Sequence, residues 1–579
     1  MKAAAIIIHM LLISCCFSTS YAAREGAISP SVTTPRLEPK IPVLDSPKII
    51  LPTPLVNDIP AGAESFSFVL KRLDVEGGFS DLAATTSDFY TEYIGQELTI
   101  VDLFNIATKI QSAYNSAGYF LVQVFVPAQT IEDGIARIVI SEATISDVDV
   151  SGLPARYQKK VKAIFADLMT TTHLRREQLE RALLLSNDLA GLKIESTLVP
   201  GQEPRTTVLF IEGQHRLVSG RLNFDNFASD ALRNEGGLFS LALNSPTGHG
   251  EELSFLGSFH PSIKELGRHQ PVRASGQLAA YFPLGSNGWS LNADVIRSVT
   301  HPRGRIITSL KLRARLNDWS AGLSYPLILT RRNALILDGK FEYIDEVLQS
   351  DIVRPRFTLS HDSLRVLHFG ATWNHQVGGT LGGGQFSLAG RLSQGLDAFG
   401  ARDDPQGGAA LSRADGKVDF TKLDVYFTHH FPLPKNQFTG SLSAKGQITS
   451  EPLLVAQQFS LGGPNFGSGQ TTGAVIGDYG FALRGELHRA VPVDVKGHFL
   501  NVQPYVFAEF GRAYLKKSTA AEEKYTSVAD VGLGLRFTLF DNDRSYRVYT
   551  AFFEYAKQLD GPAGEDNGSK LSFTLGLNF

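Results

Sequence analysis

The sequence predicts a transmembrane antiparallel β-barrel of about sixteen strands, preceded by two small α+β domains. Three observations predict it. The chain starts with a secretory signal, a β-α-α-β-β order occurs twice before residue 214, and apolar and polar residues then alternate as far as Phe579. Successive side chains of a strand point to opposite faces, so this alternation gives a sheet with one apolar face.

The first 22 residues have the features of a signal peptide. Lys2 precedes an apolar run over residues 3–13, and Ala22 completes a small-x-small cleavage site. We expect residues 1–22 to be removed, and with them both cysteines, Cys15 and Cys16. A lipoprotein cleavage box at Cys15 is an alternative, disfavoured because the apolar run before it is short.

Composition and hydropathy narrow the possible classes. The formal net charge of −3 gives no basic excess, so we expect no nucleic-acid partner. After residue 22, no apolar run approaches the roughly 18–20 residues of a spanning helix. If the exported chain crosses a membrane, it must do so as a closed barrel, because only helices and closed barrels satisfy all backbone groups in lipid.

Residues 23–64 are rich in proline and have no helical periodicity. Proline fixes φ and removes a hydrogen-bond donor, so we interpret this stretch as an extended periplasmic tether. A plug or docking segment is the alternative. The prolines are Pro30, Pro35, Pro39, Pro42, Pro47, Pro52, Pro54 and Pro60.

The two repeats occupy residues 65–143 and 144–213. In the first, Thr99 is a predicted helix cap, followed by apolar residues at helical spacing. The tandem recurrence of one order supports both assignments. In the first repeat we expect strands at 66–75, 120–126 and 135–140, with two helices after the first strand, the second of them beginning at residue 100. In the second repeat we expect strands at 148–150, 193–199 and 206–211 and helices at 157–169 and 175–189.

The predicted barrel covers residues 214–579. Its 366 residues (579 − 213) give about 23 per strand for sixteen strands, although fourteen or eighteen would also divide acceptably. Asp338, Lys340 and Glu342 share one face, and a lipid-exposed charge costs about 2–4 kcal/mol, so that face should look into water. A soluble β-sandwich is disfavoured by the signal peptide and the terminal phenylalanine.

Together, the signal, the two repeats and a barrel ending in Phe579 resemble the two-partner secretion transporters (ShlB/FhaC/HecB type) of the Omp85 superfamily. The resemblance implies two periplasmic POTRA domains and a barrel in the outer membrane of a Gram-negative bacterium, with Phe579 as a C-terminal assembly signal. It implies a secreted exoprotein partner, a TpsA-like adhesin or haemolysin. It also implies outer-membrane lipid and lipopolysaccharide, the barrel assembly machinery and periplasmic chaperones as partners. An Omp85-type assembly factor is the alternative, and a passive porin is a third, against which the two soluble repeats argue.

A sixth extracellular loop at about 460–480 is expected from the same resemblance. Residues 459–466 resemble the start of a loop that folds back into the lumen, and its tip would be Gly467, Ser468, Gly469 and Gln470. The family tip carries an arginine where this chain has Ser468. The family's barrel-wall motif Phe-x-Asp-x-Gly is matched by Phe507, Glu509 and Gly511, with Glu in place of Asp.

Both halves of that contact have therefore changed. A serine offers at best one hydrogen bond where an arginine would pair with the acid through two. Either the loop tip is held more weakly, or Glu509 takes another cation, or Glu509 is an ordinary lumen-facing acid. Arg484 is a less favoured substitute, because it lies further along the chain in an expected strand.

The expected activity is transport, not catalysis. The sequence has no G-x-x-x-x-G-K-[ST] phosphate loop and no metal-ligand spacing of histidines, so we expect no enzyme activity and no cofactor. We expect the POTRA domains to capture the unfolded partner by adding its extended segment to a sheet edge. The candidate edge residues are Val122, Val124 and Val126 in the first repeat and Ile194, Ser196 and Leu198 in the second.

Overall fold

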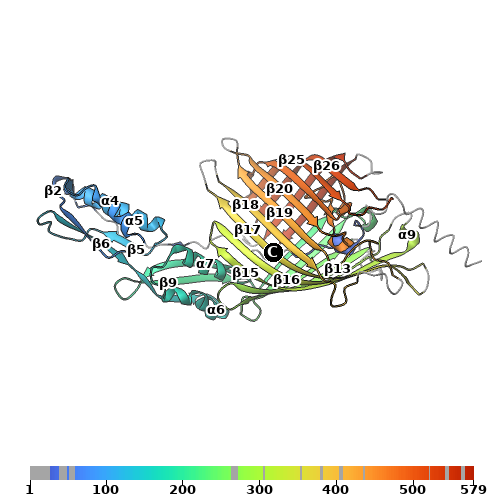
Figure 1. Cartoon of the computed structure of the whole chain (residues 1–579), viewed down its shortest axis with the longest axis horizontal. Coiled ribbons are helices and arrows are strands. Elements are labelled where there is room, and N and C mark those ends of the chain that lie inside the picture. Colours follow the sequence, from blue (N-terminus) through green and yellow to red (C-terminus); the bar gives the residue numbers. More distant parts are fainter. Residues whose placement is uncertain are drawn as a thin grey trace, which may run out of the picture.

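The computed structural model describes residues 26–37, 49–50, 59–60, 62–261, 271–303, 307–352, 355–378, 383–402, 409–433, 437–520, 522–541, 547–562 and 568–579. Two small α+β domains extend from one end of a large β-barrel (Figure 1). The expected signal peptide, residues 1–22, lies outside the described residues. Among the residues described, no helix combines the length and apolar character needed to cross a bilayer.

The first domain has the expected order of helices and strands, with two differences. The expected strand 66–75 is split into two strands, and an additional strand precedes the second helix. Thr99 caps that helix as predicted: its hydroxyl accepts from the Asp102 N–H (3.3 Å), and the Asp102 carboxylate accepts from the Thr99 N–H (2.9 Å). The elements are β2 (Ser67–Val69), β3 (Arg72–Glu76), α4 (Ala83–Thr91), β4 (Glu97–Thr99), α5 (Ile100–Ser116), β5 (Val122–Phe125) and β6 (Ile135–Glu142).

The second domain repeats the order around its own core. Tyr157, Phe165 and Leu179 are buried between its two helices and its sheet. The sheet order is β1-β8-β9-β7, in which the added strand β1 (Ile49–Ile50) comes from the proline-rich stretch. The other elements are β7 (Thr144–Gly152), α6 (Ala155–Phe165), α7 (Arg176–Asn187), β8 (Leu192–Pro200) and β9 (Thr206–His215).

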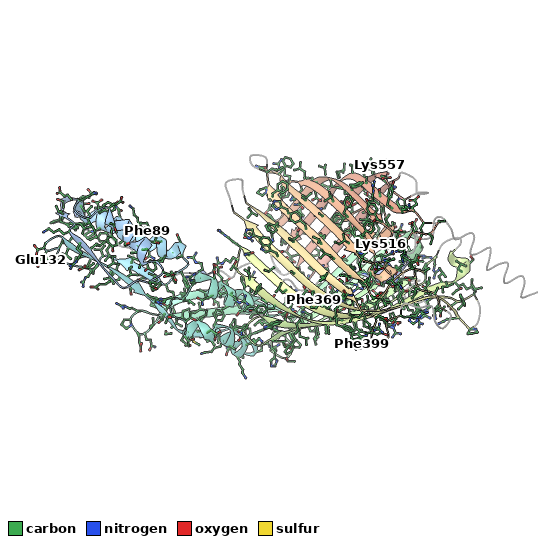
Figure 2. All side chains as sticks on the ribbon, viewed as in Figure 1. Phe89, Glu132, Phe369, Phe399, Lys516 and Lys557 are labelled. Carbon is green, nitrogen blue, oxygen red and sulfur yellow. The ribbon has the colours of Figure 1, made fainter. Side chains whose placement is uncertain are left out.

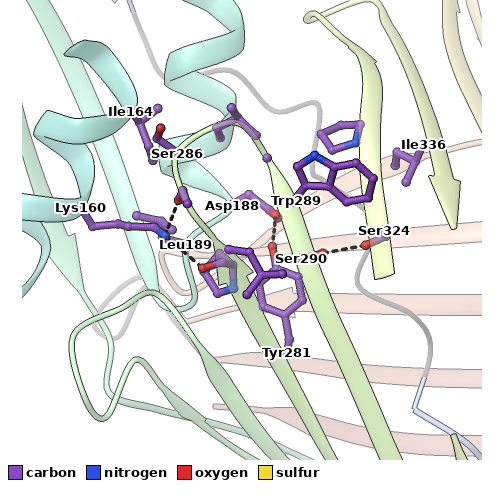
Figure 3. Close-up of a pocket in the computed structure, with 16 residues that line it drawn as sticks. Lys160, Ile164, Asp188, Leu189, Tyr281, Ser286, Trp289, Ser290, Ser324 and Ile336 are labelled. Atoms are coloured by element: carbon purple, nitrogen blue, oxygen red, sulfur yellow. Dashed lines mark hydrogen bonds between the residues drawn. The ribbon is translucent and has the colours of Figure 1, made fainter. Parts of the chain in front are cut away.

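This second domain is joined to the barrel rim by polar contacts. The Lys160 ammonium group donates to the carbonyls of Pro283 (3.0 Å) and Gly285 (2.5 Å), and Tyr281 donates to Asp188 (2.9 Å). Figure 3 shows these contacts around a small pocket between the α6 side of the domain and the barrel turn that carries Ser286. Burial in this joint lowers the pKa of Lys160. The second domain is therefore held against the barrel rim in part by the Lys160 ammonium group, which is partly shielded from water.

The barrel is a closed antiparallel sheet of sixteen strands, as predicted. One of them is interrupted, because β23 and β24 both pair with β25, one after the other. The strands are β10 (Val218–Asp225), β11 (Gly236–Asn244), β12 (Glu252–Phe259), β13 (Arg273–Leu284), β14 (Trp289–Thr300), β15 (Leu312–Leu329), β16 (Asn333–Ser350), β17 (Phe357–Val377), β18 (Gly384–Gly395), β19 (Thr421–Pro432), β20 (Thr439–Thr449), β23 (Tyr479–His488) with β24 (Val491–Val495), β25 (His498–Tyr514), β26 (Tyr525–Phe540), β27 (Val548–Asp560) and β28 (Ser569–Asn578); a short helix, α9 (Ile307–Leu310), precedes β15.

The predicted alternation separates an apolar outside from a polar inside. Along β28, the Leu571 side chain is 63% exposed and its neighbour Ser572 only 2%. Phe369, on the outer surface of β17 (Figure 2), is also exposed, whereas Glu342 is buried in the lumen. An apolar outer surface of this kind is what a barrel presents to lipid.

The barrel closes where β28 meets β10. Five residue pairs join these strands, against eight between β10 and β11. Phe579 adds one more pair, because its N–H donates to the Gly220 carbonyl (2.9 Å) and its carbonyl accepts from the Gly220 N–H (2.8 Å). A Cβ atom on Gly220 would lie 2.6 Å from the Phe579 ring, so this position requires glycine.

Candidate functional site in the barrel lumen

The long loop between β20 and β23 folds back into the lumen. Its strands β21 (Phe459–Leu461) and β22 (Val475–Gly477) pair with each other and pack on the inner wall. At the loop's end, the buried carboxylate of Asp478 pairs with Arg413 and accepts from the backbone N–H of Leu453 (2.9 Å) and of Lys516 (2.6 Å). These contacts fix the base of the loop.

The loop tip meets the wall where the sequence analysis expected. The backbone N–H groups of Gly467 (3.0 Å) and Ser468 both donate to one oxygen of Glu509, and that of Gly469 donates to Asp530 (3.2 Å). Lys570 donates to the backbone carbonyl of Gln470 (2.8 Å). The tip is therefore held chiefly through its main chain.

The cation of this contact comes from the wall. Arg484, on β23, donates to the Ser468 hydroxyl (2.9 Å), to Glu509 (3.0 Å) and to Glu554 (2.6 Å). Its guanidinium also lies over the Phe507 ring, 3.8 Å from the centroid. Arg484, a less favoured partner in the sequence analysis, is thus the cation that contacts both Glu509 and the loop tip.

The register of the barrel strands explains why Arg484 contacts Glu509. Arg484 is directly opposite Glu509 in the β23–β25 pair, so a wall residue reaches the acid without leaving its strand. The sequence analysis disfavoured Arg484 because it lies further along the chain, in an expected strand. The useful signal was the alternation around Arg484, which places it on the lumen face. Gly511 has a separate role: a Cβ atom there would lie 3.0 Å from the Leu461 side chain, so this glycine makes room for the loop.

The first described residues, 26–37, also lie inside the barrel, so this part of the expected periplasmic tether lies where the plug alternative would place it. The Arg36 guanidinium pairs with Asp318 (2.7 Å), which is fully buried, and with Glu342 (3.2 Å). Ser29, just before the short helix α3 (Pro30–Thr33), donates to Glu346 (2.5 Å). Proline content indicated an extended chain but not its location, which depends on acids of distant barrel strands.

This internal segment runs along the lumen. The carbonyl of Ala27 accepts from Ser229 (2.7 Å), in the β10–β11 loop at the barrel end far from the two domains. Further along, the Leu37 N–H donates to Gln277 within β13 (2.7 Å), and β1 follows on the second domain. We call residues 26–37 the lumen segment.

The two candidate capture edges differ in the structure. The side chains of Val122 and Val124 point into the core, and Val126 lies beyond the end of β5. Those of Ile194, Ser196 and Leu198 are buried as well. A partner strand could therefore add to each edge through main-chain groups alone, and on β8 the chain's own β1 already pairs in parallel, with Ile49 opposite Ser196.

The ionisable groups show no metal-binding arrangement. In the ranges that the structure describes, no group of three or more His, Cys, Asp or Glu side chains is placed to hold a metal ion.

A sixteen-stranded barrel with an inward-folded loop and two repeated α+β domains defines an outer-membrane protein of the Omp85 type. Residues 205–537 match the model of the haemolysin secretion/activation proteins ShlB/FhaC/HecB, and residues 68–143 match the ShlB-type POTRA domain. The chain belongs to this family. It is a two-partner secretion transporter of the outer membrane with periplasmic POTRA domains, as predicted, and its partner is a secreted exoprotein.

Individual relatives are distant but cover most of the chain. The heme/hemopexin transporter protein HuxB of Haemophilus influenzae (strain 86-028NP) is 24% identical over 499 residues, which is 84% of this chain and 82% of that protein. The structure of CdiB from Escherichia coli has a TM-score of 0.69 at 19% identity and covers 100% of this chain and 98% of its own. CdiB from Acinetobacter baumannii has a TM-score of 0.58 at 14% identity, with the same coverage. The two structures support the fold.

Proposed function

We propose that this transporter captures its unfolded exoprotein on the POTRA sheet edges and passes it through a lumen closed at rest by the lumen segment and the inward loop. One observation carries the proposal. A single N-terminal stretch lies at both places, since residues 26–37 lie in the lumen and Ile49–Ile50 pair with the β8 edge.

This arrangement couples capture to opening. Among the described residues, Ile49 and Ile50 are the two that pair with β8, and an exoprotein strand of ordinary length would make more main-chain hydrogen bonds than these two and replace them. The lumen segment would then lose its attachment to the second POTRA domain. Binding of the exoprotein in the periplasm would thereby favour departure of the segment that blocks its route.

The energy for movement comes from outside the chain. The sequence contains no nucleotide-binding phosphate loop, so export proceeds without ATP hydrolysis by this protein, and folding of the exoprotein at the cell surface gives the direction. The apolar outer belt contacts outer-membrane lipid and lipopolysaccharide. A chain with such a surface needs periplasmic chaperones and the barrel assembly machinery on its way to the membrane.

The coupling is tested by breaking β1. Ile49→Pro/Ile50→Pro removes both N–H donors of the added strand, whereas Ile49→Ala/Ile50→Ala keeps them and is the control. In the proline variant we expect tighter binding of the exoprotein by purified transporter and a larger open fraction in planar-bilayer recordings. Wild-type binding and conductance in that variant, at normal barrel levels, would contradict the proposal.

A further inference from the structure

A glutamine side chain covers part of the outward edge of the first POTRA domain. Gln111, on α5, donates from its amide nitrogen to the Val122 carbonyl (2.9 Å), and its amide oxygen accepts from the Val124 N–H (2.8 Å). Among the described strands, β5 is the last in the order β3-β6-β5. Gln111 therefore bonds the main-chain groups that β5 directs away from β6.

These two contacts copy those of a neighbouring strand. In a parallel ladder, one residue donates to the carbonyl of residue i and accepts from the N–H of residue i+2 of its neighbour. A carboxamide offers the same donor and acceptor as a peptide group. The Gln111 amide thus stands where one residue of a parallel strand would lie, opposite Gln123.

The second domain shows the same device beside a real added strand. On β8, the counterpart of β5, the Asn187 side chain accepts from the Ile194 N–H (3.2 Å). Two residues further along the same edge, Ile49 of β1 pairs in parallel with Ser196. The edge that an amide side chain partly covers is therefore one that takes an extended polypeptide in parallel.

We propose that Gln111 is a displaceable cap on the first POTRA domain, and that an exoprotein strand enters parallel to β5 by taking over the Val122 carbonyl and the Val124 N–H. Asn115, one turn later on α5, provides a second acceptor for the released amide, since its side-chain oxygen lies 3.3 Å from the Gln111 nitrogen. The cap keeps the edge closed to chance pairing at rest. This inference depends on the capture function proposed above. It adds the register in which the exoprotein strand pairs with β5 and the side chain that must move first.

The first test needs no partner. Gln111→Leu keeps a side chain of similar size but removes both hydrogen bonds. Gln96→Leu, whose amide bonds a helix carbonyl in the same domain (2.8 Å), is the matched control. In the full-length transporter, we expect hydrogen exchange of the Val124 N–H to be about tenfold faster in Gln111→Leu only. Unchanged exchange would show that the cap does not protect the edge.

The second test uses the exoprotein, unfolded in urea and diluted into the assay. A fluorophore on Gln123→Cys reports occupation of β5, and one on Glu195→Cys reports β8; both side chains are exposed. Gln111→Leu should bind roughly tenfold more tightly at the first site, and Gln96→Leu should match wild type. Equal or weaker binding in Gln111→Leu would overturn the cap. A fluorescence change at Glu195→Cys with none at Gln123→Cys would overturn the β5 site but leave the capture function intact. No change at either position, in a transporter that secretes normally, would reject the capture function itself.

Discussion

The contact between Arg484 and Ser468 gives a sharp prediction about how the lumen loop is held. Arg484 belongs to the wall and keeps Glu509 and Glu554 as partners whether or not the loop is docked. Its one side-chain contact at the tip is the Ser468 hydroxyl. Ser468→Ala therefore removes the shorter of the two bonds from Arg484 to the loop, keeps the longer one to the Pro464 carbonyl (3.4 Å), and leaves the ion pairs of the wall in place.

The expected magnitude follows from the type of bond. A hydrogen bond to a charged group contributes about 1.5–3 kcal/mol, which corresponds to an increase of about 10- to 150-fold in the released fraction of the loop. Arg484→Met removes this bond and the longer one to the Pro464 carbonyl (3.4 Å), so it should raise release by at least the same factor. It should also destabilise the barrel by about 3–5 kcal/mol, because two buried carboxylates lose their cation.

Release is measured by labelling a cysteine at the tip. Gln470 is 2% exposed, and its side-chain amide has no hydrogen-bond partner among the described residues, so Gln470→Cys should be tolerated and should react with a membrane-impermeant maleimide only when the loop leaves. Ser460→Ala, in the same loop, is the control, because the Ser460 contact with Lys445 uses the backbone carbonyl.

The double variant decides between explanations. If the Ser468 hydroxyl acts through Arg484, Ser468→Ala/Arg484→Met labels no faster than Arg484→Met alone. Additive effects would mean that the two residues act independently. Labelling far faster in Arg484→Met than in Ser468→Ala would mean that charge, and not this bond, holds the tip.

Three further predictions concern the lumen segment, the POTRA joint and the barrel seam. Arg36→Ala leaves Asp318 and Glu342 without the Arg36 guanidinium and should raise the open fraction in single-channel recordings at least tenfold. Arg36→Lys keeps a positive charge and should stay closer to wild type. Equal conductance in wild type and both variants would contradict a plugging role. Burial lowers the pKa of Lys160 from 10.5, so the docked POTRA domain binds fewer protons than the undocked one. Docking should therefore strengthen as the pH rises from the lowered pKa towards 10.5. If cross-linking across the joint becomes weaker over this pH range, the prediction is wrong. Deletion of Phe579 removes the final pair of the seam and should lower the yield of heat-modifiable barrel on gels, with Phe579→Tyr as control.

The sequence was informative wherever local periodicity decides the structure. Alternation such as that of Leu571 and Ser572 predicted the barrel and its two faces, and Thr99 predicted a helix start. The misses involve partners far apart in the chain. Arg36 and Glu342 are 306 residues apart, and Arg484 and Glu554 are 70 apart. Such pairs depend on the register of a closed sheet, which one sequence does not reveal.

The path of the lumen segment also constrains how the protein can be put together. Residue 27 contacts a loop at the far rim, Leu37 contacts β13 inside the barrel, and the hydrogen-bonded ring of strands encircles residues 27–37. These residues are therefore threaded through a ring that is formed by later strands of the same chain. They either pass through the finished barrel or are enclosed when β28 joins β10, and a tightly folded domain fused ahead of residue 26 would block the first route and so distinguish the two.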